Sequence, residues 1–161
     1  MCSSDLGRLV KNKGFQDVLD VLTLLPNVTC VIIGDGPLRG ALEKQAARVG
    51  VCDRVTFVGW LQESADVYRV MQTGKIFVMN SKSEGGPRVA VEAMALGIAP
   101  VVTSVGIMPE IVQDGENGFF TTGEPDDLAQ KIRSLLDDDE LRSVMGTRAR
   151  EVLHHFDRAT L

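Results

Sequence analysis

Short apolar runs alternate with amphipathic helical segments along almost the whole sequence, and this alternation restricts the fold more than any other feature. The run at residues 28–33 is apolar and rich in β-branched residues, which is typical of a strand buried on both faces of a parallel sheet. The strands expected on this basis span residues 7–10, 28–33, 54–58, 76–79, 99–103 and 119–120. Such alternation implies right-handed βαβ units, so we predict an α/β fold, a doubly wound parallel sheet of about six strands with helices on both faces.

Helices are expected between these strands, and turn residues mark the ends of several of them. Apolar residues recur at helical spacing from Phe15 to Leu25, and Pro26 stops that helix. Gly50 ends the next helix. Because ligands of parallel sheets bind at the carboxyl ends of the strands, the loops that follow the strands should gather at the ligand-binding edge. These loops span residues 10–14, 34–37, 59–62, 80–87 and 104–109.

The composition excludes several classes of protein. With 161 residues, the chain is long enough for one domain with a substantial core. Its formal net charge of −5 argues against nucleic acid as a partner and against broad binding to anionic membranes. The sequence has no run of about eighteen apolar residues, so we expect no transmembrane helix. The three cysteines, Cys2, Cys30 and Cys52, form no C-x-x-C pair, so we expect no disulfide framework, no metal site and a reducing, cytoplasmic location.

Residues 1–6 are expected to be a sequence artefact or a tail. The letters C-S-S-D-L can be read as the translation of a common sequencing-adapter end, and the opening has neither the basic nor the apolar region of a signal peptide. We therefore expect the domain to span residues 7–161, and the chain to be a fragment that is cut on its N-terminal side.

Two carboxylates, Glu84 and Glu92, stand in the stretch S-K-S-E-G-G-P-R-V-A-V-E-A-M-A-L-G at residues 81–97. From residue 89 to residue 96 every side chain except that of Glu92 is apolar, which predicts a helix buried on all sides. A buried carboxylate needs hydrogen-bond partners. Two vicinal hydroxyls of a polyhydroxyl ligand could supply them, and a nearby Arg, Lys or backbone N–H is the alternative.

Two basic residues, Arg8 and Lys13, flank the first loop at the ligand edge of the expected sheet. An Arg can bind two phosphate oxygens at once and a Lys acts as a point charge, so the pair suits a diphosphate. The alternative is a solvated basic loop.

The glycines Gly34 and Gly36 follow a strand and precede a helix, as in a dinucleotide-binding fingerprint. That motif also needs an acidic residue at the end of the next strand, where this sequence reads V-G-W-L, and Pro37 breaks its usual pattern. Trp60, in that V-G-W-L segment, could pack on a nucleobase or cover the sheet edge.

The pattern S-x-S-E-G-x-P-x-x-x-x-E-A-M-A-x-G-x-x-P-V-V strongly resembles the E-x7-E signature of retaining, nucleotide-sugar-dependent glycosyltransferases with the GT-B fold. The closest group is family 4, the glycosyl transferases group 1. The segment G-R-L-x-x-x-K-G similarly resembles the phosphate-binding loop of that family. The resemblance runs from about residue 7 to residue 156 and covers only the donor-binding, C-terminal half of a GT-B enzyme, which is a Rossmann-like domain.

The resemblance implies a role for each matching residue. Glu84 would contact the donor sugar, Glu92 would hold the ribose hydroxyls, and Arg8 and Lys13 would neutralise the diphosphate. Two positions depart from the family pattern: Gly86 stands where many relatives carry Phe, and Ile107 replaces a usual Gly. The implied catalytic residues are Glu84, Arg8 and Lys13, and the implied donor-binding residues are Gly34, Gly36, Gly59, Trp60, Gly85, Gly86, Pro87, Glu92 and Glu110.

The implied reaction is the retaining transfer of a hexosyl group from a UDP-, GDP- or ADP-sugar to an acceptor hydroxyl, without a cofactor. The N-terminal acceptor-binding domain of the family is absent from this sequence, so we expect the chain alone to be inactive. That domain and an acceptor sugar or lipid-linked sugar would be its partners, and any membrane association would come through that domain. The alternatives are a non-catalytic nucleotide-sugar-binding module and an NAD(P)-binding Rossmann protein.

Overall fold

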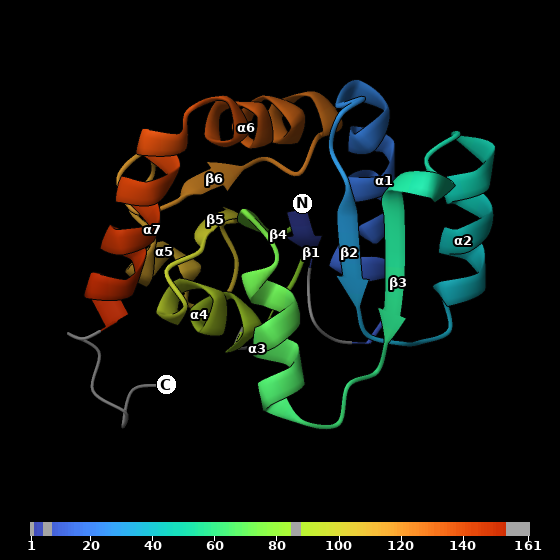
Figure 1. Cartoon of the computed structure of the whole chain (residues 1–161), viewed down its shortest axis with the longest axis horizontal. Helices are drawn as coiled ribbons and strands as arrows, with labels where there is room; N and C mark the ends of the chain where they lie inside the picture. The colour runs from blue at the N-terminus through green and yellow to red at the C-terminus, as the bar shows by residue number, and fades with distance from the viewer. Residues whose placement is uncertain (1, 5–7, 85–87, 154–161) are drawn as a thin grey trace.

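The six strands form one sheet in which all paired strands run parallel (Figure 1). The computed structural model describes residues 2–4, 8–84 and 88–153 of the chain. The strand order is β3-β2-β1-β4-β5-β6, which is the order of a doubly wound nucleotide-binding fold. The strands are β1 (Cys2–Ser4), β2 (Cys30–Ile33), β3 (Val55–Gly59), β4 (Ile76–Met79), β5 (Ala99–Thr103) and β6 (Phe119–Thr121).

Helices cover both faces of the sheet, as predicted. Buried residues of α1, α2 and α6 form one hydrophobic cluster with the sheet, and those of α3, α4 and α5 form a second cluster. Helix α7 contributes Met145 to the first cluster and Ala149 to the second. None of the described helices is long and apolar enough to cross a membrane. The helices are α1 (Phe15–Leu24), α2 (Arg39–Arg48), α3 (Ser64–Gln72), α4 (Arg88–Ala95), α5 (Met108–Ile111), α6 (Pro125–Asp137) and α7 (Asp139–Leu153), with short 3-10 helices η1 (Lys11–Lys13) and η2 (Cys52–Arg54).

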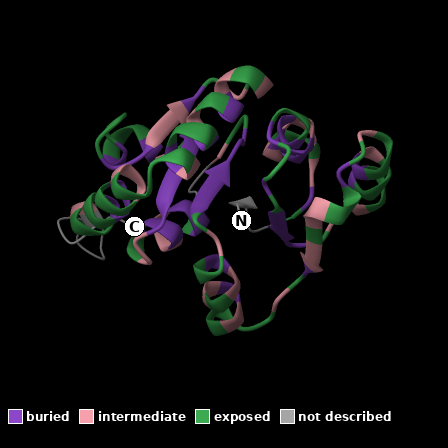
Figure 2. Cartoon of the chain, turned by 45° about the horizontal axis from the view of Figure 1, so that its top comes forward, coloured by how far each residue is buried: buried purple, intermediate pink, exposed green. Residues whose placement is uncertain are grey.

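Strand β4 is apolar throughout because both of its faces are covered by helices. Ile76 and Val78 lie in the first hydrophobic cluster, and Phe77 and Met79 lie in the second. Since successive side chains of a strand point to opposite faces, a strand covered by helices on both sides needs an apolar residue at each position. In Figure 2, strands β2, β4 and β5 are coloured as buried and the outer sides of the helices as exposed.

The first strand differs from the prediction. Residues 8–10 form no strand, and β1 instead lies at Cys2–Ser4, where it pairs with both β2 and β4. Leu9 is held outside the sheet because its N–H donates to the carbonyl of Asp35 and its carbonyl accepts from Leu38 N–H. The expectation that residues 1–6 are an artefact stays a prediction. Strand β1 reads C-S-S and is less apolar than its neighbours, β2 with C-V-I-I and β4 with I-F-V-M.

Helix α4 is not buried on all sides, so that prediction is wrong. Val89, Ala90, Ala93 and Met94 are buried, but Ala95 is exposed and Glu92 is only partly buried. The helix packs against α3, α7, β4 and β5, and Glu92 lines a cavity together with residues of α3. The carboxylate therefore faces a partly open site rather than the core.

Candidate functional site

The order of the strands reverses between β1 and β4, and the candidate site lies at the carboxyl ends of these two strands. From β1 the chain moves through β2 to β3 on one side, and from β4 through β5 to β6 on the other. Ligands of open α/β sheets bind at such a reversal. The loop after β1 carries Lys13 and the loop after β4 carries Glu84, so the topology brings these two residues together.

Gly14 allows the two loops to pack closely. Its φ of 72° lies in the left-handed region, and a Cβ at this position would lie 2.2 Å from the carbonyl oxygen of Asn80. A second contact fixes the same approach, because the N–H of Lys82 donates to the carbonyl of Asn12 at 2.7 Å. Only glycine permits both the left-handed conformation and the close contact, and the result is that η1 lies against the β4–α4 loop.

The side chains of Lys13 and Glu84 form an ion pair across these loops. They retain exposures of only 18% and 11%, so neither charge is fully solvated. Removing one partner from such a pair leaves the other charge without compensation, which is costly in a partly buried site.

A cavity of about 430 Å³ surrounds this ion pair. The volume lies within the range of about 300–1,000 Å³ that is usual for small-molecule sites. Trp60 forms an exposed wall, with 65% of its surface accessible. The cavity is built by three stretches that lie far apart in the sequence, and its lining residues are Lys13, Trp60, Leu61, Gln62, Ser64, Val67, Tyr68, Glu84, Arg88, Val89 and Glu92.

Helix α4 contributes two charged side chains to the cavity. Arg88 and Glu92 are four residues apart and so lie on the same face of the helix. Arg88 is exposed, and its side chain has no hydrogen bond or ion pair with any residue that the structure describes. The sequence analysis missed Arg88, although its spacing from Glu92 was a usable signal.

Several predicted site residues do not line this cavity. Arg8 is exposed, and Glu110 is exposed in α5; neither belongs to the lining residues. The predicted turn residues Gly85, Gly86 and Pro87 lie outside the described residues. Lys13, Trp60, Glu84 and Glu92 are the predicted residues that the structure does bring together.

The predicted glycines shape the neighbouring loops. Gly34 and Gly59, with φ of 130° and 82°, form a bridge in which Gly34 N–H donates to the Gly59 carbonyl at 2.8 Å. A Cβ on Gly36 would lie 2.6 Å from the backbone nitrogen of Leu9. The backbone of Leu9 thus fills the space that a side chain at residue 36 would need, and neither Gly34 nor Gly36 nor Gly59 lines the cavity.

Asn80 is a second residue that the sequence analysis missed. It is 2% exposed, and its Nδ2 donates to the Asp17 carboxylate at 3.3 Å and to the Gly123 carbonyl at 3.2 Å. Burial raises the pKa of the Asp17 carboxyl, while the charge of Lys82 and the hydrogen bond from Asn80 act in the opposite direction. Asn80 thus ties the end of β4 to α1 and to the β6–α6 loop.

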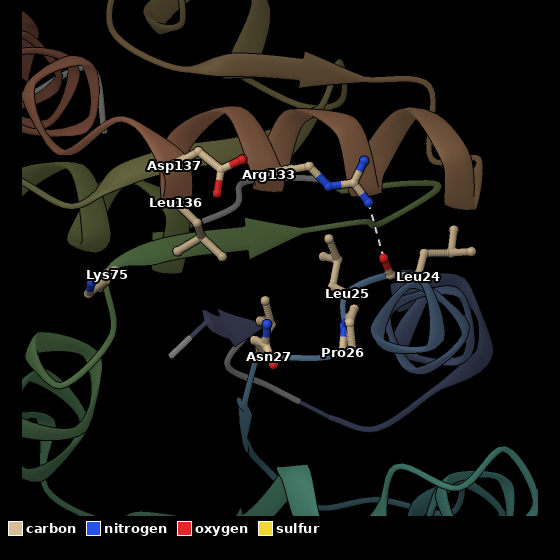
Figure 3. Close-up of a pocket in the computed structure, with 9 residues that line it drawn as sticks. Leu24, Leu25, Pro26, Asn27, Lys75, Arg133, Leu136 and Asp137 are labelled. Atoms are coloured by element: carbon tan, nitrogen blue, oxygen red, sulfur yellow. Dashed lines mark hydrogen bonds between the residues drawn. The ribbon is translucent and has the colours of Figure 1, made fainter.

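Another cavity, of about 410 Å³, lies near the amino ends of β2 and β4 (Figure 3). Its lining includes Leu24, Lys75 and Arg133, and Arg133 donates to the carbonyl of Leu24 at 3.1 Å. None of the predicted site residues lines this cavity. It lies at the amino ends of the strands, whereas ligands of such sheets bind at the carboxyl ends. Neither there nor elsewhere in residues 2–4, 8–84 and 88–153 do three His, Cys, Asp or Glu side chains form a group that could hold a metal ion.

The chain is similar in sequence to enzymes that transfer sugars. The family model described as Glycosyl transferases group 1 matches residues 5–152. The sulfoquinovosyl transferase of Arabidopsis thaliana is 34% identical over 156 residues, which cover 94% of this chain and 30% of that protein. A lipopolysaccharide core biosynthesis glycosyltransferase of Rhizobium meliloti is 33% identical over 150 residues, covering 92% of this chain and 43% of that protein. The chain thus spans less than half the length of these curated relatives.

Solved structures show the same fold. HepE of Anabaena, in complex with UDP and glucose, matches with a TM-score of 0.88 and 31% identity over 99% of this chain and 45% of that chain. The C-terminal domain of a glycosyl transferase group 1 protein of Francisella tularensis matches with a TM-score of 0.86 and 27% identity. That match covers 95% of this chain and 84% of the Francisella domain.

Proposed function

The chain belongs to the glycosyl transferases group 1 family, and from this premise we propose that it binds the nucleoside-diphosphate sugar donor of a retaining hexosyl transfer. Its fold is that of the C-terminal half of a GT-B enzyme, as predicted. We propose a UDP-sugar as the donor, supported by the complexes of the related HepE with UDP and with UDP-glucose.

One observation carries this proposal: a single cavity brings Lys13, Trp60, Glu84 and Glu92 together from separate segments. Each residue suits one part of the donor. Lys13 provides positive charge for the diphosphate, and Trp60 provides an aromatic surface for the base. Glu92 accepts hydrogen bonds from the two ribose hydroxyls, and Glu84 accepts from hydroxyls of the sugar.

These roles define what the protein contributes to the reaction. The bond between the anomeric carbon and the β-phosphate oxygen breaks, and a bond to the acceptor oxygen forms on the same face of the sugar. Negative charge develops on the departing diphosphate, where Lys13 stabilises it electrostatically, with Arg8 as a proposed second cation. The departing phosphate accepts the proton of the acceptor hydroxyl. The ion pair of Lys13 with Glu84 holds both groups where the diphosphate meets the sugar.

A second domain is proposed to complete the enzyme. The curated relatives are more than twice as long as the matched region, which supports an acceptor-binding domain as the partner of this one. We propose that it binds a sugar or lipid-linked acceptor, provides any membrane association, and makes transfer possible, so that this chain alone binds the donor without transferring the sugar. We also propose a cytoplasmic location, from the three cysteines without a C-x-x-C pair in the sequence.

The test is a calorimetric titration of UDP, GDP, ADP and NAD into the purified chain and its Glu92→Gln variant. We expect UDP to bind, and the variant to bind it at least about tenfold more weakly, because it loses charge-assisted hydrogen bonds to the ribose. Glu140→Gln is the control, since Glu140 is exposed on α7 and lies outside the cavity. Binding of NAD that survives Glu92→Gln would favour the dinucleotide-binding alternative and overturn the proposal.

A further inference from the structure

We propose that Arg88 binds the donor phosphate that is attached to the ribose, as a cation additional to those expected from the sequence. This assignment rests on the proposed function and identifies a further donor-binding residue in the same site. It is carried by the charges that line the cavity, by the position of Arg88 on α4, and by its lack of another partner.

The charged side chains that line the cavity carry no net positive charge to offset a diphosphate. The charged lining residues are Lys13, Glu84, Arg88 and Glu92, so their formal charges cancel. Lys13 is already paired with Glu84, and Arg8 does not line the cavity. A diphosphate brings at least two further negative charges. Arg88 is the lining cation whose charge no described carboxylate offsets through an ion pair, so it is available for the diphosphate.

The position of Arg88 relative to Glu92 indicates which phosphate it meets. Four residues along a helix correspond to about 6 Å, so Arg88 lies one turn from the carboxylate assigned to the ribose. The phosphate nearest to the ribose is bonded to its 5′ oxygen and lies about that far from the hydroxyls. Arg88 also occupies the first turn of α4, where the helix dipole favours an anion. A planar guanidinium can bind two oxygens of that phosphate at once.

Arg88 has no visible structural task that would explain it otherwise. It is exposed, and no hydrogen bond or ion pair joins its side chain to any described residue. A conservative substitution should therefore leave the fold intact and change only the interaction with a ligand. This separates Arg88 from Lys13, whose removal would also leave the Glu84 charge without its partner.

The experiment is a calorimetric titration of uridine, UMP and UDP into the chain and into Arg88→Gln and Arg88→Lys. We expect Arg88→Gln to weaken UMP and UDP binding alike, by about tenfold at low salt, and to leave uridine binding unchanged. Arg88→Lys should restore part of the affinity, because it keeps the charge and loses the two-point geometry. The control is Arg69→Gln, because Arg69 is exposed on α3, pairs with Asp66 and does not line the cavity.

The outcomes distinguish this assignment from the proposed function. A first outcome is that the unaltered chain binds UDP and that Arg88→Gln binds UMP and UDP with the same affinities as the unaltered chain. In that case the assignment fails and the function stands. An equal loss for uridine would mean that Arg88 acts on the shape of the site, which also overturns the assignment. A loss for UDP without a loss for UMP would place Arg88 at the other phosphate and so overturn the assignment. No UDP binding by the unaltered chain would overturn the function and this assignment together.

Discussion

Gly14 determines where the loop that carries Lys13 lies. A Cβ there would stand 2.2 Å from the Asn80 carbonyl, and the backbone is in the left-handed region at a φ of 72°. Gly50 has a nearly identical φ of 74°, but a Cβ on it would meet nothing within 4 Å. Alanine at either position would strain the backbone, but only alanine at position 14 would also collide with the neighbouring loop. Comparing the two substitutions therefore separates the free-energy cost of backbone strain from that of the close contact.

We predict that Gly14→Ala lowers the free energy of unfolding by at least about 2 kcal/mol more than Gly50→Ala. Gly50→Ala should cost only the strain of a left-handed alanine, about 1 kcal/mol. Gly14→Ala adds the collision with Asn80 and moves Lys13 away from Glu84, so it should also weaken UDP binding. Urea unfolding and UDP titration of both variants measure this. Equal losses of stability, with equal UDP affinity, would show that the contact does not position the loop.

At the scale of single residues, the sequence identifies side chains better than it identifies their contacts. Lys13, Glu84 and Glu92 could be predicted because each stands in a motif. Asn80 could not, since its partners Asp17 and Gly123 are distant in the sequence and meet only when α1 and the β6–α6 loop pack around the end of β4. The spacing of Arg88 from Glu92 placed both on one helix face, but the predicted burial of α4 on all sides left no open face for a cation.

At the scale of secondary-structure elements, Asp127 stabilises the beginning of α6. Its carboxylate accepts hydrogen bonds from Thr122 N–H at 2.8 Å and from the Thr121 hydroxyl at 2.9 Å. Burial by itself would raise the pKa of Asp127, but these hydrogen bonds and the charge of Lys131 outweigh it, so the pKa lies below its usual value. Asp126, its neighbour in the first turn, is exposed, and its side chain has no hydrogen bond with a described residue.

We predict that Asp127→Asn lowers the free energy of unfolding by about 1 kcal/mol at neutral pH, since solvent screens this partly exposed site. Because the folded-state pKa is lowered, the contribution is complete above the unfolded-state pKa of about 3.9 and is lost as the pH falls through the folded-state pKa. Asp126→Asn should lose only a few tenths of a kcal/mol from the helix dipole. Urea unfolding between neutral and acidic pH measures this, and a difference that persists at the lowest pH would contradict the assigned cause.

The elements themselves were largely predictable where the local pattern agreed with the packing. The bounds of β4 and β5 match the predicted strands because both are apolar runs covered on both faces. The prediction failed for β1, because Leu9 and its neighbours look like a strand end but bond to the turn after β2. It also failed for the burial of α4, since an apolar composition does not show which side of a helix lacks a neighbour.

At the scale of the whole molecule, the reversal of strand order between β1 and β4 explains why the site forms. It places the loop of Lys13 beside the loop of Glu84, and α4 continues from the second loop with Arg88 and Glu92. The β3–α3 segment closes the opposite wall with Trp60. The sequence predicted this edge of the sheet from the loops that follow the strands, whereas the extent of the cavity depends on side chains that only the folded chain brings together.

The most direct test of the proposed donor site is to map UDP onto the folded chain by NMR, from backbone amide shifts of the isotope-labelled protein. We predict that the shifts that change cluster at Lys13, Trp60, Tyr68 and Glu92, around the cavity at the carboxyl ends of β1 and β4. Changes that cluster instead around Leu24, Lys75 and Arg133, near the amino ends of β2 and β4, would contradict the account.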